Sequence, residues 1–144
     1  MGRAKFDYLQ CVRDAPHETR ENVFHVTGDV QEDLAINTTS AYAAAHEAMI
    51  SFQALPSTVP KTFIYTGNIL NEGPIPGSLT LGVGKIASAH MIELGDNLYR
   101  SRNIRFFFVD KRMEDGTPMF IGAGPQAHAD MFLALADRTA GDVP

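Results

Sequence analysis

Apolar residues recur along residues 41–55 with the spacing of an amphipathic helix. Ala41, Ala45, Ala48, Phe52 and Leu55 fall at intervals of three or four residues and share one face. The segment 37–40 reads Asn-Thr-Thr-Ser, residue types that commonly cap helix N-termini, and prolines at 56 and 60 end the run. The pattern predicts an alanine-rich helix whose small side chains allow another helix to approach closely.

Short apolar runs predict three strands, and two further helices alternate with them. The strands are expected at residues 6–12, 62–66 and 104–109, and the helices at 84–100 and 127–137. The run Ile-Arg-Phe-Phe-Phe-Val at 104–109 is continuous, as in strands buried on both faces of a parallel sheet. The 84–100 helix carries an apolar stripe made of Ala87, Met91, Leu94 and Leu98. This alternation predicts an α/β fold, a truncated Rossmann-like parallel sheet of about three strands with flanking helices.

Composition and charge narrow the possible partners. The chain of 144 residues suits one domain, and 12 Lys and Arg against 17 Asp and Glu give a net charge of −5. No basic stripe is present to neutralise phosphates, so we expect no nucleic-acid partner. No apolar stretch approaches the ~20 residues of a membrane span, and we expect no membrane association. One cysteine, Cys11, cannot form an internal disulfide, which favours a reducing, cytoplasmic location.

One glycine motif suggests a dinucleotide-binding turn, but its context does not fit. Gly82-Val-Gly84-Lys85-Ile-Ala87 matches G-x-G-x-x-A. The residues before it have the composition of a loop, whereas the motif should leave a buried strand directly. Asp110 lies 28 residues after Gly82 instead of the ~20 expected for a ribose-binding acid. We therefore assign no dinucleotide site to this motif.

The same features, in a different alignment, are similar to a known family. An Asn opens an Ala-rich helix, a strand ends at Gly67-Asn68, Gly84-Lys85 lies near a helix start, and Arg105 is second in an apolar strand. This order resembles the C-terminal half of a short-chain dehydrogenase/reductase, in a divergent branch that lacks the catalytic tyrosine. The resemblance implies that residues 1–144 form a single half-domain without the dinucleotide-binding first half, and it makes residues 6–12 that family's fourth strand.

The resemblance also assigns roles to individual residues. Lys85 takes the place of the catalytic lysine, Asn37 that of the active-site asparagine, Asn68 that of the serine, and Leu81 that of the missing tyrosine. Leu81, Tyr65 and Tyr42 are the expected substrate-binding residues, and either tyrosine could replace the missing acid.

Each of these residues also has a structural interpretation that the sequence leaves open. Lys85 could be a solvated lysine, Asn37 a helix N-cap, Asn68 a turn residue with positive φ, and the two tyrosines core residues. No His, Asp or Glu grouping has a complete set of metal ligands, and we expect neither a metal nor a cofactor.

Three functions remain open at this level. The first is a small-molecule-binding protein with a degenerate active site, in which Lys85 and the asparagines polarise the carbonyl of a small hydrophobic compound for isomerisation or cyclisation without a cofactor. The second is half of an NAD(P)-dependent oxidoreductase completed by another chain. The third is a non-catalytic, dimerising pseudoenzyme. The resemblance implies a homodimer in which helices 41–55 and 84–100 pack across the axis as a four-helix bundle.

Overall fold

The structure, a computed structural model, describes residues 30–119 and 124–137. In chain order the elements are α2 (Val30–Leu34), the π-helical turn η1 (Ala35–Thr39), α3 (Ser40–Gln53), β1 (Lys61–Thr66), the 3-10 turn η2 (Ile69–Asn71), α4 (Leu79–Tyr99), the 3-10 turn η3 (Arg100–Arg102), β2 (Ile104–Val109) and α5 (Pro125–Asp137). Every element expected within these residues is present. The strand expected at 6–12 and Cys11 lie outside the described residues.

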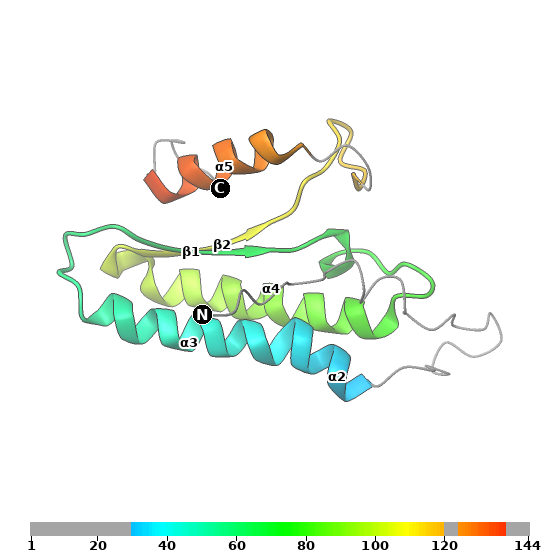
Figure 1. The fold of residues 1–144 in the computed structure, drawn as a ribbon, viewed down its shortest axis with the longest axis horizontal. Coiled ribbons are helices and arrows are strands. Elements are labelled where there is room, and N and C mark those ends of the chain that lie inside the picture. The colour runs from blue at the N-terminus through cyan, green and yellow to red at the C-terminus, as the bar shows by residue number, and fades with distance from the viewer. Residues whose placement is uncertain (1–29, 120–123, 138–144) are drawn as a thin grey trace, which may run out of the picture.

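The elements form three layers, with the sheet between α5 on one side and α3 and α4 on the other (Figure 1). Strands β1 and β2 pair in parallel, from Lys61 opposite Ile104 to Thr66 opposite Val109. The α/β class and the parallel sheet with flanking helices are therefore confirmed. Within the described residues the sheet has two strands.

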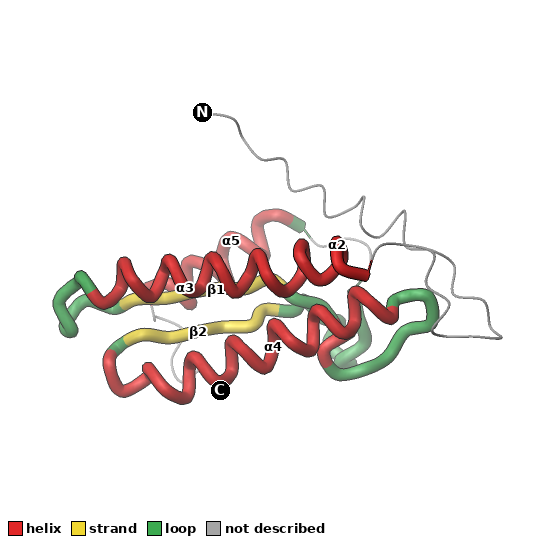
Figure 2. The backbone as a smooth tube through the Cα atoms, turned by 90° about the horizontal axis from the view of Figure 1, so that it is seen from below, coloured by secondary structure: helices red, strands yellow, loops and turns green. Residues whose placement is uncertain are grey.

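Helix α4 runs along β2 and forms the main core with it (Figure 2). Ile92 is 2% exposed and packs in one cluster with Ala45 of α3 and with Ile104 and Phe106 of β2. The ring of Phe106 lies 5.5 Å from that of Phe63, so the aromatic side chains also link the two strands. This core fixes α4 against the sheet and thereby sets where its first turns lie.

Both long helices begin earlier than the sequence predicts. The α4 helix starts at Leu79, five residues before the expected Gly84, so part of the predicted loop is helical. The glycines at 82 and 84 lower the helix propensity of this turn, but packing overrides propensity here. Gly84 lies against Asn37, and a Cβ at position 84 would come within 2.8 Å of the Asn37 Cβ. A bulkier residue at this crossing would force η1 and α4 apart.

The apolar stripe on α4 faces outward. Leu94 and Leu98 are 49% and 58% exposed, whereas the buried side of the helix includes Gly84, Ser88 and Ile92. On α3, Ala41 and Ala45 are buried, so part of the alanine face packs within the chain. The α3–α4 pair thus leaves an apolar outer surface.

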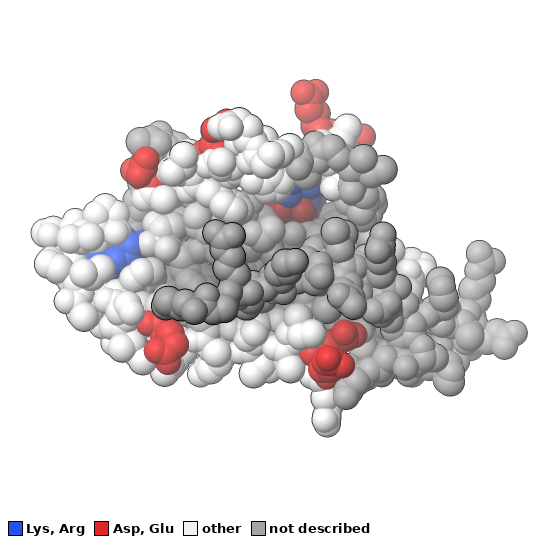
Figure 3. All heavy atoms as spheres, in the orientation of Figure 1, with Lys and Arg blue, Asp and Glu red and all other residues white. Residues whose placement is uncertain are grey.

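The charge distribution of the described residues shows no basic stripe on the face drawn in Figure 3, where the acidic side chains stand in separate groups. In residues 30–119 and 124–137, no helix combines the length and the apolar character that crossing a membrane requires.

Candidate active site

The π-helical turn η1 presents the main-chain carbonyl of Asn37 to the sheet and to α4. This carbonyl oxygen accepts a hydrogen bond from Ser88 Oγ at 2.8 Å and another from Tyr65 OH at 3.1 Å. The Asn37 side chain instead donates from Nδ2 to the carbonyl oxygen of Asp33 at 3.0 Å. Asn37 lies inside a continuous helical run from Val30 to Gln53, so its interpretation as an N-cap is wrong. The wider π turn, invisible in the sequence, offers this carbonyl to outside donors.

Lys85 lies on the buried side of α4, two turns from the helix start. Its side chain is only 2% exposed, which excludes the solvated interpretation. The Nζ atom donates to Tyr65 OH at 3.1 Å and lies 4.9 Å from the centre of the Tyr65 ring. Burial of an ammonium group is costly unless it is hydrogen-bonded, so these contacts help to hold the cation in the interior.

Tyr65 links the lysine to the π turn. It is the fifth residue of β1, its ring is half-buried, and its centroid lies 5.6 Å from that of Phe108 on β2. Its hydroxyl accepts from Lys85 and donates to the Asn37 carbonyl. We call these three residues, with Ser88, the Tyr65–Lys85 network. The structure thus brings together Lys85, Asn37 and Tyr65 from the residues expected at the site.

The other three expected residues have different surroundings. The Asn68 side chain accepts from Leu70 N at 3.1 Å and caps η2, and its φ of −159° is extended, so the positive-φ interpretation is wrong. Leu81 lies on α4 one turn before Lys85 and is partly buried. Tyr42 is 61% exposed on α3 and stacks on His46 with the ring centres 6.4 Å apart. Tyr42 therefore lies on the outer surface and is not a core residue.

Sequence reasoning missed Ser88, which is fully buried and donates to the Asn37 carbonyl. The available signal was the pair of small residues Gly84 and Ser88, four apart on one helix face, which marks a close crossing. Thr38 takes part in the same contact, because its Oγ1 donates to the Gly84 carbonyl at 3.5 Å.

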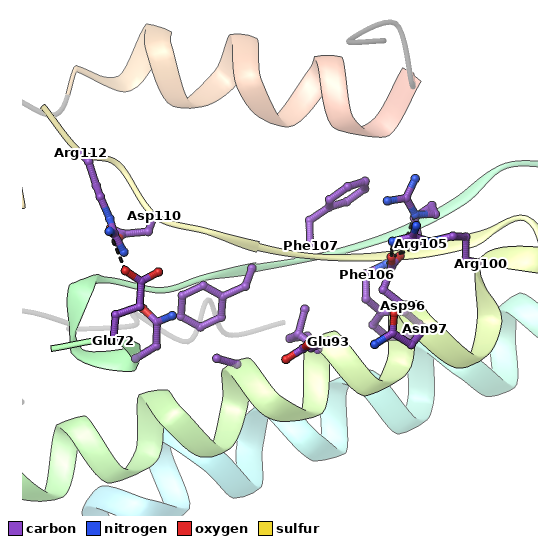
Figure 4. A pocket seen from close by; sticks show the side chains of 14 residues that line it. Glu72, Glu93, Asp96, Asn97, Arg100, Arg105, Phe106, Phe107, Asp110 and Arg112 are labelled. Atoms are coloured by element: carbon purple, nitrogen blue, oxygen red, sulfur yellow. Dashed lines mark hydrogen bonds and ion pairs between the residues drawn. The ribbon is translucent and has the colours of Figure 1, made fainter. Parts of the chain in front are cut away.

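A second polar cluster ties the end of α4 to β2. Asp96 accepts from Arg105 Nε at 2.7 Å, from Phe106 N at 3.0 Å and from Arg100 Nη2 at 2.6 Å (Figure 4). Burial alone would raise the pKa of Asp96, but the hydrogen bonds from Arg105, Phe106 and Arg100 outweigh it and hold the pKa below its ordinary value. The cluster fixes α4 on the sheet and, through α4, the position of Lys85.

The described residues do not fit a dinucleotide through the glycine motif. Gly82 and Gly84 lie inside α4 and not at a strand-to-helix turn, and Gly84 faces Asn37 at close range. A pyrophosphate cradle requires glycine main chain at a helix N-terminus that follows a strand, and this arrangement is absent from the motif. Across the described part of the chain, no group of three or more His, Cys, Asp or Glu could hold a metal ion.

Comparison with known proteins agrees with this fold. No family model matches the sequence. The chain is 46% identical over 112 residues, 77% of its length, to the short chain dehydrogenase/reductase dmxR12 of Cryptosporiopsis sp. (strain 8999). The match covers 46% of that protein, so the chain spans about half the length of this curated relative. In sequence and in fold, the chain is short-chain dehydrogenase/reductase-like.

Proposed function

We propose that the chain binds a small apolar carbonyl compound and polarises its carbonyl group with Tyr65 and Lys85, for proton-transfer chemistry such as isomerisation or cyclisation without a cofactor. The observation that carries the proposal is the hydrogen-bonded chain from Lys85 Nζ to Tyr65 OH and on to the Asn37 carbonyl, with 3.1 Å at each step.

Tyr65 is the acid in this proposal because Leu81, at the family's tyrosine position, has no ionisable group. A phenol hydroxyl can donate to a carbonyl oxygen, and a cationic donor on its own oxygen strengthens that donation. Lys85 supplies such a donor from a side chain that is almost fully buried, where electrostatic interactions are screened little by water.

The proposed chemistry requires only that the Tyr65 hydroxyl change its hydrogen-bond acceptor. The substrate carbonyl oxygen replaces the Asn37 carbonyl as the acceptor of the Tyr65 proton, while Ser88 continues to donate to Asn37. Negative charge that develops on the substrate oxygen is then stabilised by Tyr65 and Lys85. A solvent base removes a proton from the adjacent carbon while Tyr65 delivers its proton to the oxygen, which gives the enol. In the return step the enol hydroxyl gives its proton back to Tyr65, and the carbon takes a proton from solvent.

The test is exchange of α-protons for deuterium in a neutral apolar ketone, cyclohexanone, followed by NMR in D2O without added cofactor. The wild-type chain accelerates exchange, and Tyr65→Phe lowers the protein-dependent rate about 10²–10⁴-fold, the usual contribution of a general acid. Lys85→Met lowers it as well. Tyr42→Phe is the matched control, because Tyr42 is exposed on α3 and outside the network.

Equal rates for wild type and Tyr65→Phe would overturn the assignment of Tyr65. Folding of each variant is checked by circular dichroism, so that a lost rate is not read from an unfolded chain.

A second candidate is half of an NAD(P)-dependent oxidoreductase that needs another chain segment. The name of the similar protein, and the fact that the match covers only 46% of it, favour this candidate. Titration of the chain with NADPH, followed by fluorescence, separates the two. Binding of NADPH by the chain at micromolar concentration supports the oxidoreductase and argues against cofactor-independent chemistry.

Self-association belongs to the proposal as well. The outer face of α3 and α4 holds a groove of about 360 Å³ lined by Ile50, Leu94 and Leu98 among others, and these three side chains are about half exposed. Exposed apolar patches of this kind mark association surfaces, so we assign this face to a homodimer. A dimer that binds no carbonyl compound would instead support the pseudoenzyme.

A further inference from the structure

A pocket of about 590 Å³ lies between the loop after β1 and the first turns of α4. Its walls are mostly hydrocarbon, contributed by Leu70, Pro74, Ile75, Leu79, Val83 and Ile86. We infer that this pocket is a second ligand site, separate from the Tyr65–Lys85 network, and that it takes a neutral, apolar small molecule.

The pocket and the network lie on different sides of α4. Lys85 and Ile86 are neighbours in sequence, yet Lys85 is 2% exposed and Ile86 is 55% exposed. Tyr65, Lys85, Asn37 and Ser88 do not line the pocket. A ligand bound there would not contact the proposed acid, so the inference goes beyond the proposed function.

Hydrogen-bonded turns hold the loop wall in place. Leu70 N donates to Asn68 Oδ1, Glu72 N donates to the Ile69 carbonyl, and Ser78 N donates to the Ile75 carbonyl, at distances between 2.9 and 3.1 Å. Gly77 adopts a φ of +83° in the turn that leads into α4, a conformation that suits glycine. The prolines at 74 and 76 add stiffness, because the ring fixes φ. The wall is therefore largely preformed, as binding pockets usually are.

The charge around the pocket selects a neutral ligand. The charged residue that lines the pocket is Glu72. Its carboxylate pairs with Arg112 Nη1 at 2.9 Å, as Figure 4 shows. Arg112 also pairs with Asp110 at 2.8 Å, so its charge is directed to the two carboxylates. Among the residues that the structure describes, no cationic side chain lines the pocket, so an anion gains no partner there, and the carboxylate of Glu72 is already paired with Arg112, whereas an apolar molecule gains contact with the aliphatic walls. The volume lies within the range of pockets that bury a drug-sized molecule.

The test uses the neutral fluorescent probe N-phenyl-1-naphthylamine, titrated into the wild-type chain and into Val83→Asp. Val83 is 47% exposed on the pocket wall, so the substitution places a charge on that wall without emptying the core. Leu133→Asp is the matched control, because Leu133 is an exposed aliphatic residue on α5, 61% exposed and outside the pocket. Ile86→Asp is a second pocket variant in case Val83→Asp is unstable.

We expect saturable probe binding to wild type and to Leu133→Asp, and at least about tenfold weaker binding to both pocket variants, since an unpaired charge in an apolar site is costly. Equal binding to all chains, or no saturable binding to wild type, would overturn the inference. Loss of probe binding together with loss of self-association, measured by light scattering, would also overturn it, because the face would then be an interface between copies. The probe has no carbonyl group, so failure of the proposed chemistry leaves this result unchanged.

Discussion

The contact between Gly84 and Asn37 predicts a specific cost for a single methyl group. A Cβ at position 84 would lie 2.8 Å from the Asn37 Cβ and 3.3 Å from Thr38 Oγ1, whereas carbon atoms prefer about 3.5–4.0 Å. Gly84→Ala must therefore separate α4 from η1, and overpacking of this kind costs about 1–3 kcal/mol. The same change gains about 1 kcal/mol of helix propensity, so the net loss of folding free energy is about 0–2 kcal/mol.

Gly82→Ala is the control that cancels the gain in helix propensity when it is compared with Gly84→Ala. Gly82 lies two residues earlier in the same helix, and a Cβ there would meet no atom within 4 Å. Both variants gain the same propensity, so the difference between their unfolding free energies isolates the steric cost at about 1–3 kcal/mol. Urea denaturation of the two variants and of wild type measures it. If Gly84→Ala were as stable as Gly82→Ala, the close crossing that aims the Asn37 carbonyl would be refuted.

Two further perturbations test the polar cluster around Asp96 and the proposed dimer face. The pKa of Asp96 in the folded chain is below the ordinary 3.8, so the unfolded chain binds this proton first. The stabilisation from ionised Asp96 is complete above about pH 3.8 and is lost as the pH falls through the folded pKa. Asp96→Asn should therefore flatten the dependence of the unfolding free energy on pH in that range, and it should cost about 2–4 kcal/mol at neutral pH, discounted because Arg100 is exposed. An unchanged pH dependence would contradict this. At the proposed dimer face, the double variant Leu94→Asp, Leu98→Asp should halve the mass seen by light scattering, and a wild-type monomer at micromolar concentration would refute the dimer.

Much of the fold followed from the sequence because its signals are local. The run of branched and aromatic residues at 104–109 predicted β2 with its observed bounds, and the alanine-rich pattern predicted α3 to within two residues at either end. The start of α4 did not follow, since Gly82 and Gly84 lower helix propensity and only the contact of Gly84 with Asn37 explains why glycine is there. Asp96, four residues before Arg100, carried an ion-pair signal, but its contact with Phe106 N depends on the tertiary fold.

The residues of the site were partly predictable, but the contacts between them were not. Lys85 and Asn37 were expected from the resemblance, and Tyr65 was expected as a substrate-binding residue that could replace the missing acid. What joins the three is the π turn, which exposes the carbonyl of Asn37, together with the position of α4 on the sheet. No periodic pattern in the sequence predicts either feature, so the hydrogen-bonded chain from Lys85 to Tyr65 could be found only from the structure.

In the proposed chemistry, the hydroxyl of Tyr65, with Lys85 donating to it, delivers the proton to a bound carbonyl oxygen. The most direct measurement is the ratio of the α-proton exchange rates of wild type and Tyr65→Phe in D2O, with the chain folded in both cases. We expect a ratio of about 10² or more, because Tyr65→Phe removes the hydroxyl oxygen that carries the acidic proton. A ratio near one, with wild type still above the rate in buffer, would contradict it.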